Sequence, residues 1–237
     1  MQIHFLAGPP FGPGLYEGVI RRLKQNGLNA NVLDPFAESG HPAKIIEQLE
    51  CIIGSNDVLV AHGTALPLAT EMSQIIPLSA LFLSNGPITA IDPATRLYSK
   101  SSRWMRNMAM KPFWAIPTLR SSIGLRRLVV NPYVMDHDTI VRVCQPLKQS
   151  PKHRKHYAEF FGNLRSMTPI TQPKSTQTYL IWGDSDLLYP THQASSILSS
   201  WKDTFLIEIA GAKHLHPIES PWAMADIIRD QIYTTMT

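Results

Sequence analysis

The stretch LVAHGTALPLA, residues Leu59 to Ala69, is the part of the chain that decides how the rest is interpreted. It joins a short apolar strand to a segment that favours a helix, with Ala61 and Ala65 as small residues on either side of Gly63. Glycine adopts unusual backbone conformations without a steric penalty. The stretch therefore predicts a sharp strand-to-helix turn centred on Gly63.

Outward from this stretch, short apolar strands alternate with helical patterns in both directions along the chain. Strands are predicted at residues 2–6, 30–33, 57–61, 78–83, 178–182 and 204–209. Helices are predicted at residues 15–24, 43–53, 64–73, 192–201 and 222–233. Such alternation indicates an α/β fold with a mostly parallel sheet and helices on both faces.

The alternation stops between residues 93 and 172, where the sequence lacks strands and is rich in Arg, Met and Trp. Helices are predicted there at Thr139–Leu147 and His153–Leu164. We therefore divide the chain into a core, residues 1–92 and 173–237, and a helical cap, residues 93–172. The cap aromatic and methionine side chains could form its own core or an apolar substrate tunnel: Trp104, Met105, Met108, Met110, Phe113 and Trp114.

The charge is distributed unevenly between these two parts. Residues 96–165 hold 14 Lys/Arg and three acids, which gives +11, and the rest holds 8 Lys/Arg and 15 acids, which gives −7; the sum is the net +4. A basic cap could attract a phosphorylated carrier, an acidic carrier protein, nucleic acid or an anionic membrane surface. The alternative is a solvated helical surface. We predict a small-molecule substrate, which could be attached to an anionic group or acidic carrier, and no nucleic-acid partner.

No apolar stretch approaches the roughly 20 residues that span a bilayer, so no membrane span is predicted. The N-terminus has no basic region and no cleavage site typical of a signal peptide. Cys51 and Cys144 have no metal-ligand spacing and suggest no disulfide framework. We predict a cytoplasmic protein without a metal or another cofactor.

Two C-terminal segments place ionisable residues directly after predicted strands. LIWGDSDLLYP, residues Leu180 to Pro190, and IAGAKHLHPIESP, residues Ile209 to Pro221, resemble the acid and histidine segments of the α/β-hydrolase superfamily. The order of segments is also similar to that family along nearly the whole chain. The resemblance implies an α/β-hydrolase fold with Asp186 as the acid and His214 as the histidine; Asp184 and His216 are the weaker alternatives.

The chain departs from the family where the serine nucleophile belongs. The family pattern is small-x-Ser-x-small at a strained turn, and here Gly63 stands in the serine position, after His62. Moving the register by one residue would promote Thr64, but its flanking residues His62 and Leu66 are too large. Gly63 therefore offers no hydroxyl for attack.

The resemblance also implies an oxyanion hole, of which this chain retains one donor. That donor is the backbone N–H of Thr64. The second would come from the loop after the first strand, where Pro9 and Pro10 have no N–H to donate. Loss of one such donor costs about 3 kcal/mol of transition-state stabilisation in a serine hydrolase. The predicted substrate pocket is formed by Pro9, Phe11, His62, Ser84 and Asn85, although the last two could instead be polar residues of an ordinary turn.

Three functions fit these features. The first is an enzyme without a covalent step, in which His214, oriented by Asp186, is a general base towards a small acyl, ester or carbonyl substrate. Suitable reactions are those of a lyase, isomerase or cyclase, or direct hydrolysis. The second is a non-catalytic binding or scaffold protein on a degenerate hydrolase fold. The third is a serine hydrolase whose nucleophile has been replaced at Gly63, which Pro9 argues against.

Overall fold

The computed structural model describes residues 1–111, 115, 117–119, 124–174 and 177–236. The cap residues Phe113 and Trp114 lie outside the described residues.

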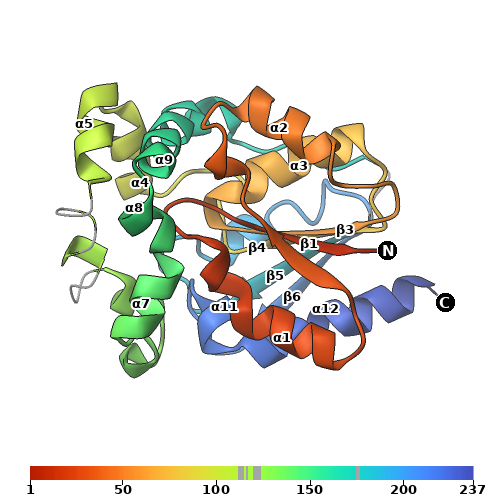
Figure 1. Ribbon diagram of the computed structural model, residues 1–237. Helices are drawn as coiled ribbons and strands as arrows, with labels where there is room; N and C mark the ends of the chain where they lie inside the picture. Colours follow the sequence, from red (N-terminus) through yellow and green to blue (C-terminus); the bar gives the residue numbers. More distant parts are fainter. Residues whose placement is uncertain (112–114, 116, 120–123, 175–176, 237) are drawn as a thin grey trace.

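A single sheet of six parallel strands forms the centre of the molecule (Figure 1), in the order β2-β1-β3-β4-β5-β6. The strands are β1 (Ile3–Ala7), β2 (Ala30–Leu33), β3 (Val58–His62), β4 (Ala80–Ser84), β5 (Gln177–Gly183) and β6 (Thr204–Ile209). All five neighbouring pairs are parallel. The predicted parallel sheet is thus confirmed, with strand limits that differ from the predicted ones by two residues at most.

Helices cover both faces of this sheet (Figure 1). On one face lie α1 (Glu17–Gln25) and α12 (Pro221–Met236), which pack against each other. The opposite face carries α2 (Pro42–Glu50) and α3 (Leu66–Ile75). The strands β1, β3 and β4 are buried at every position because both of their faces are covered.

The segment between β4 and β5 is helical. Its helices fall within residues 93–167, which are most of the predicted cap and which we call the insert. Its helices are α4 (Pro93–Lys100), α5 (Arg103–Ala109), α7 (His137–Val143), α8 (Gln145–Gln149) and α9 (Pro151–Asn163), with the 3-10 helices η4 (Leu125–Leu128), η5 (Pro132–Val134) and η6 (Leu164–Met167). The insert is attached to the loops after β1 and β2. Gly12 N donates to Val143 O over 2.8 Å, and the Tyr157 hydroxyl donates to Phe11 O over 3.2 Å.

Two helix predictions are wrong. The predicted helix Thr139–Leu147 is two helices, α7 and α8, because Pro146 lacks the N–H that a continuous helix needs and fits only the first turn of a new one. Of the helix predicted at residues 192–201, only α10 (His192–Ser195) forms. Within the described part of the chain, no helix combines the length and the apolar character that crossing a membrane requires.

Candidate active site

Five loops meet at the carboxyl end of the sheet, and each brings one candidate residue. Pro9 follows β1, Gly63 follows β3, Asn85 follows β4, Asp186 follows β5, and His214 follows β6. Parallel strands place all their carboxyl ends at the same edge, which is where α/β sheets bind ligands. Residues up to 205 positions apart in the sequence are therefore neighbours here (9 to 214).

Gly63 forms the predicted turn between β3 and the short helix η3 (Gly63–Ala65), which continues into α3. Its φ is +61°, a left-handed conformation that glycine adopts without strain. A β-carbon at this position would lie 3.9 Å from Nε2 of His214. A side chain at residue 63 would therefore point towards the histidine, as the sequence interpretation requires.

Thr64 is held in a way that leaves its backbone N–H available and its hydroxyl occupied. The hydroxyl donates to Pro9 O over 2.9 Å. The N–H groups of Thr64 and Ala65 belong to the first turn of η3, where a helix has no acceptors of its own. Such groups favour a negative charge in front of them.

The loop after β1 contributes no free backbone donor. Gly8 N donates to His62 O over 3.2 Å and Phe11 N donates to Gly8 O over 3.1 Å. Pro9 and Pro10 between them have no N–H. Of these two loops, the one at η3 would therefore be the source of any oxyanion stabilisation by backbone N–H groups.

Asp186 and His214 form a buried pair. Nδ1 of His214 lies 2.9 Å from Oδ2 of Asp186, and both residues are 3% exposed. The carboxylate also accepts from Asn85 Nδ2 over 2.6 Å and from Leu188 N over 2.7 Å. Burial on its own would raise the pKa of Asp186, but the charge of His214 and these hydrogen bonds outweigh burial and lower it. Asp186 is therefore a carboxylate at neutral pH.

Three of the predicted pocket residues need correcting. His62, Ser84 and Asn85 are fully buried, and none of them is among the described residues that line the cavity. Asn85 instead braces the acid: its amide oxygen accepts from Gly183 N over 2.9 Å while its nitrogen donates to Asp186. The φ of Asn85 is +32°, which makes a left-handed turn at the end of β4. The alternation of strands and helices in the sequence does not predict such a turn.

Ser84 joins two further histidines behind the pair. Its hydroxyl lies 3.1 Å from Nδ1 of His62 and 2.7 Å from Nε2 of His216. The ring of His62 is centred 4.8 Å from that of His214. Burial, followed by the charges of the neighbouring histidines, lowers the pKa of His62 well below its usual range and that of His216 to about 3. Both rings are therefore neutral at neutral pH, and they pack behind His214 without adding a charge.

A cavity of about 270 Å³ opens in front of Gly63, Thr64 and His214, and its wall includes Pro9 and Phe11. Most of the remaining wall is apolar, and Asp92 and Tyr189 add one hydrogen-bonded polar pair, 3.0 Å apart. A second apolar cavity of about 430 Å³ lies under α4 and α5 and shares part of its wall with the first: Pro10, Thr95, Thr118, Leu119 and Phe161. The cavity in front of His214 thus continues into a second space with mostly apolar walls.

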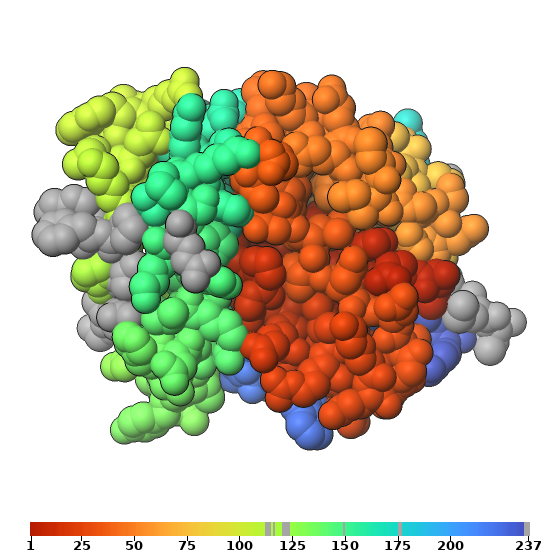
Figure 2. All heavy atoms as spheres, in the orientation of Figure 1, coloured from red at the N-terminus to blue at the C-terminus, as the bar shows by residue number. Residues whose placement is uncertain are grey.

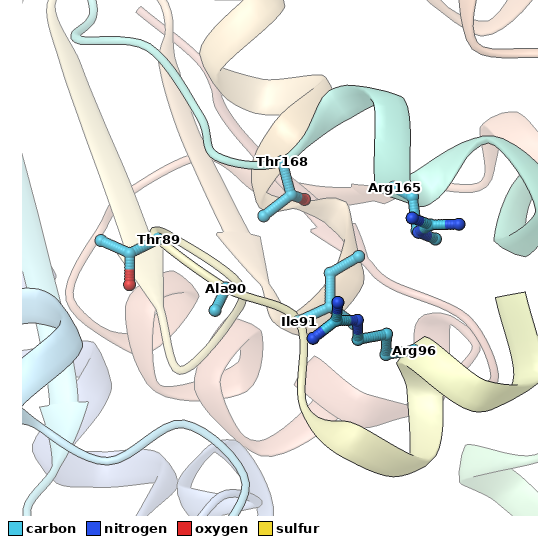
Figure 3. A pocket seen from close by; sticks show the side chains of 6 residues that line it. All are labelled: Thr89, Ala90, Ile91, Arg96, Arg165 and Thr168. Carbon is cyan, nitrogen blue, oxygen red and sulfur yellow. The ribbon is translucent and has the colours of Figure 1, made fainter. Parts of the chain in front are cut away.

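A separate hollow of about 270 Å³ lies outside these cavities, between the loop after β4 and η6. Figure 3 shows its lining, with Arg96 extending from α4 and Arg165 from η6. The described residues contain no group of three or more His, Cys, Asp or Glu side chains that could hold a metal ion.

Solved structures share this architecture over the full chain. A thermophilic esterase from Thermogutta terrifontis matches with a TM-score of 0.76 at 15% identity, covering 100% of this chain and 91% of that one. The haloalkane dehalogenase DbeA from Bradyrhizobium elkani matches with a TM-score of 0.76 at 12% identity, covering 99% and 90%. The epoxide hydrolase CorEH matches with a TM-score of 0.73 at 12% identity, covering 100% and 92%. The chain has the α/β-hydrolase fold.

No family model matches the chain, and no curated protein sequence does. The α/β-hydrolase fold predicted from the order of the motifs is thus confirmed by three-dimensional similarity. Sequence reasoning missed two contacts of the acid, those from Asn85 and from Leu188 N. A signal for the first was present, because Asn85 directly follows a strand that neighbours the one before Asp186.

Proposed function

We propose that this protein is an enzyme that uses His214 as a general base without a covalent step. Its substrate would be a small acyl, ester or carbonyl compound, and its reaction that of a lyase, isomerase or cyclase, or direct hydrolysis. One observation carries the proposal. The residue-63 side-chain position lies 3.9 Å from Nε2 of His214 and holds no hydroxyl, while Nδ1 is held by a buried carboxylate.

The chemistry follows from which ring nitrogen carries the proton. Asp186 accepts a hydrogen bond from Nδ1, so the neutral ring presents the Nε2 lone pair. His214 lines the cavity beside Gly63. Nε2 would take a proton from a substrate C–H or O–H, or from a water molecule in the space left by the missing side chain. The N–H group of Thr64 would stabilise the negative charge that develops on a carbonyl oxygen.

The competing proposal is a binding or scaffold protein on a degenerate hydrolase fold. It is favoured by the loop after β1, where Gly8 and Phe11 direct their N–H groups to other acceptors and the two prolines have none. An enzyme whose reaction needs two oxyanion donors would have low activity with this loop, because the loop supplies neither of them. The enzyme proposal is preferred because the acid–base pair has three hydrogen bonds to the carboxylate, more than a ligand-binding wall requires.

Pro9 disfavours a serine hydrolase that has simply had its nucleophile replaced, because it would still impair acyl transfer. We propose a small molecule as the substrate, alone or attached to an anionic group or acidic carrier. The apolar cavity supports a small molecule alone, and the basic insert supports one that is attached to an anionic group or carrier. We propose a cytoplasmic location, because the number and spacing of Cys51 and Cys144 suggest no disulfide framework.

The test is a screen of acyl, ester and carbonyl compounds with the native protein beside His214→Ala. The enzyme proposal expects turnover by the native protein and a loss of roughly 10²- to 10⁴-fold in His214→Ala. Substrate binding should survive in the variant because the cavity walls supply most of the contact area. Asp186→Asn should lose much of the activity, since an amide favours the wrong tautomer of His214. A compound that binds both forms equally and is converted by neither would support the binding-protein alternative.

A further inference from the structure

The outer side of the insert exposes large apolar side chains that a protein surface in water normally covers. Leu97 on α4 is 73% exposed, and Trp104 and Met105 on α5 are 70% and 54% exposed. Scattered apolar residues need no explanation, but three on two successive short helices indicate a contact surface.

The segment that contains these two helices carries positive charge without any negative charge. Residues 93–111 contain five basic side chains and no Asp or Glu: Arg96, Lys100, Arg103, Arg106 and Lys111. Arg96 also lines the outer hollow together with Arg165, Thr89 and Thr168 (Figure 3). Within the described part of the chain, neither arginine of the hollow is paired with a carboxylate.

These features lie at one end of the molecule. α4 and α5 both pack against α9, and α4 also contacts η6, which carries Arg165. In Figure 1, α5 lies at the outer edge of the insert, away from the sheet. On their inner side, Tyr98 of α4 and Met110, which directly follows α5, line the apolar cavity. The surface is thus separated from the hydrocarbon-lined space only by the thickness of α4 and α5.

We propose that α4, α5 and η6 form a docking surface for a membrane that contains anionic phospholipids. Leu97, Trp104 and Met105 would enter the boundary between headgroups and acyl chains, where tryptophan is favoured. Arg96 and Arg165 would pair with lipid phosphates, to which a guanidinium binds through two parallel hydrogen bonds.

The arginines and the exposed apolar side chains of this surface together favour a membrane as its partner over a dissolved anionic carrier. A dissolved anion would be satisfied by the arginines of the hollow alone, and it would give Leu97 and Trp104 no apolar partner. A lipid surface provides both kinds of contact at once. The proposal goes beyond the proposed function and holds for an enzyme or a binding protein alike.

The experiment is co-sedimentation of the full chain with vesicles of phosphatidylcholine alone and of phosphatidylcholine with 30% phosphatidylglycerol. Binding is expected only to the anionic vesicles, and it should weaken at about 1 M salt, where the screening length falls to about 3 Å. Arg96→Gln and Arg165→Gln should each lower the partition coefficient roughly fivefold, the effect of removing one basic residue near the surface. Leu97→Ser combined with Trp104→Ser should lower it by at least roughly tenfold.

Tyr133→Ser is the matched control, because Tyr133 is an aromatic residue of the insert that is 90% exposed and lies on η5 instead. It should bind vesicles as the native protein does. All five substituted residues are exposed, and a circular dichroism spectrum identical to the native one establishes that the variants are folded. The proposal is overturned if the native protein stays in solution, if it binds neutral vesicles equally well, or if Tyr133→Ser loses as much binding as the Leu97/Trp104 double variant. Binding of inorganic phosphate without vesicle binding would also overturn it, in favour of a dissolved anion.

Discussion

At the scale of single residues, the backbone of Gly63 is more informative than its missing side chain. A left-handed φ costs a residue with a β-carbon roughly 1–2 kcal/mol, yet serine hydrolases accept that strain at this turn to hold their nucleophile. Here the turn persists with glycine, so the geometry is kept while the strain is absent. Gly27, which ends α1, has a similar φ of +76° and lies far from the site in open surroundings.

Gly63→Ala and Gly27→Ala should therefore each lower the free energy of unfolding by about 1–2 kcal/mol in urea titrations. The methyl group at residue 63 would meet His214 at an ordinary contact distance, so strain is the main cost in both variants. Only Gly63→Ala should also change turnover or ligand binding, because its methyl group occupies the space beside Nε2. A Gly63→Ala protein as stable as the native one would contradict the assigned backbone conformation.

The buried histidines predict how stability depends on pH. His216 has a folded-state pKa of about 3, below its unfolded value near 6.5, so the unfolded chain binds its proton more readily. Stability from this group is complete above about pH 6.5 and is lost as the pH falls towards 3; His62, whose pKa is also lowered, acts in the same direction. Between pH 7 and pH 5 we expect a loss of about 2 kcal/mol for His216.

The measurement is the urea midpoint of unfolding as a function of pH. His216→Gln should flatten the slope between pH 5 and 6.5 by about one bound proton, even if the loss of its contact with Ser84 lowers stability at every pH. His192→Gln replaces an exposed histidine on α10 and should keep the native slope. An unchanged slope in His216→Gln would show that His216 is not neutral in the folded protein.

At the scale of elements, α9 connects the insert to the core. Its His153 lies 2.9 Å from Asp34, and Nδ1 of His156 lies 2.7 Å from Phe36 O. Lys152, one residue earlier, pairs with Glu38 over 2.8 Å at a site where both side chains are more than half exposed. The first two contacts are largely shielded from water, so they should hold the insert in place more firmly than the third.

His153→Ala should raise the rate at which a protease cuts within residues 93–167 by roughly fivefold, corresponding to the loss of one hydrogen bond worth about 1 kcal/mol. Lys152→Ala should change it by less than about twofold, because an exposed ion pair contributes little. The measurement is limited proteolysis of the native protein and the two variants, with the cut sites mapped. Equal sensitivity of the two variants would show that α9 is held mainly by its apolar face.

The elements also show what the sequence can and cannot predict. The central strands β1, β3 and β4 follow from apolar runs, because a strand buried on both faces has no polar alternation to obscure it. Asp186 and His214 could be assigned to one edge because both follow parallel strands. Asn85 was misplaced since the left-handed turn after β4 directs its side chain behind the cavity, a rotation that residue types do not reveal. The break at Pro146, by contrast, was visible in the sequence.

At the scale of the whole molecule, the sheet brings Asp186, His214 and the turn at Gly63 together. In the proposed function these are an acid, a base and a turn without a nucleophile. Serine-directed fluorophosphonates should therefore leave the native protein unlabelled at the turn, because Gly63 has no hydroxyl and that of Thr64 donates to Pro9 O. Mass spectrometry of the treated protein is the measurement, and Gly63→Ser, which introduces a hydroxyl, is the comparison. Stoichiometric labelling of Thr64 would show that the register of the turn is wrong.

The open position at Gly63 has a kinetic consequence. An enzyme that carries its own nucleophile acylates itself and then discharges, which gives a burst of first product and parallel lines in double-reciprocal plots. Where the attacking group has to diffuse in, both reactants must be present together, and the lines intersect. The concentration of an added alcohol would enter the rate law directly, so the surrounding solution would determine which ester, acid or amide the protein produces.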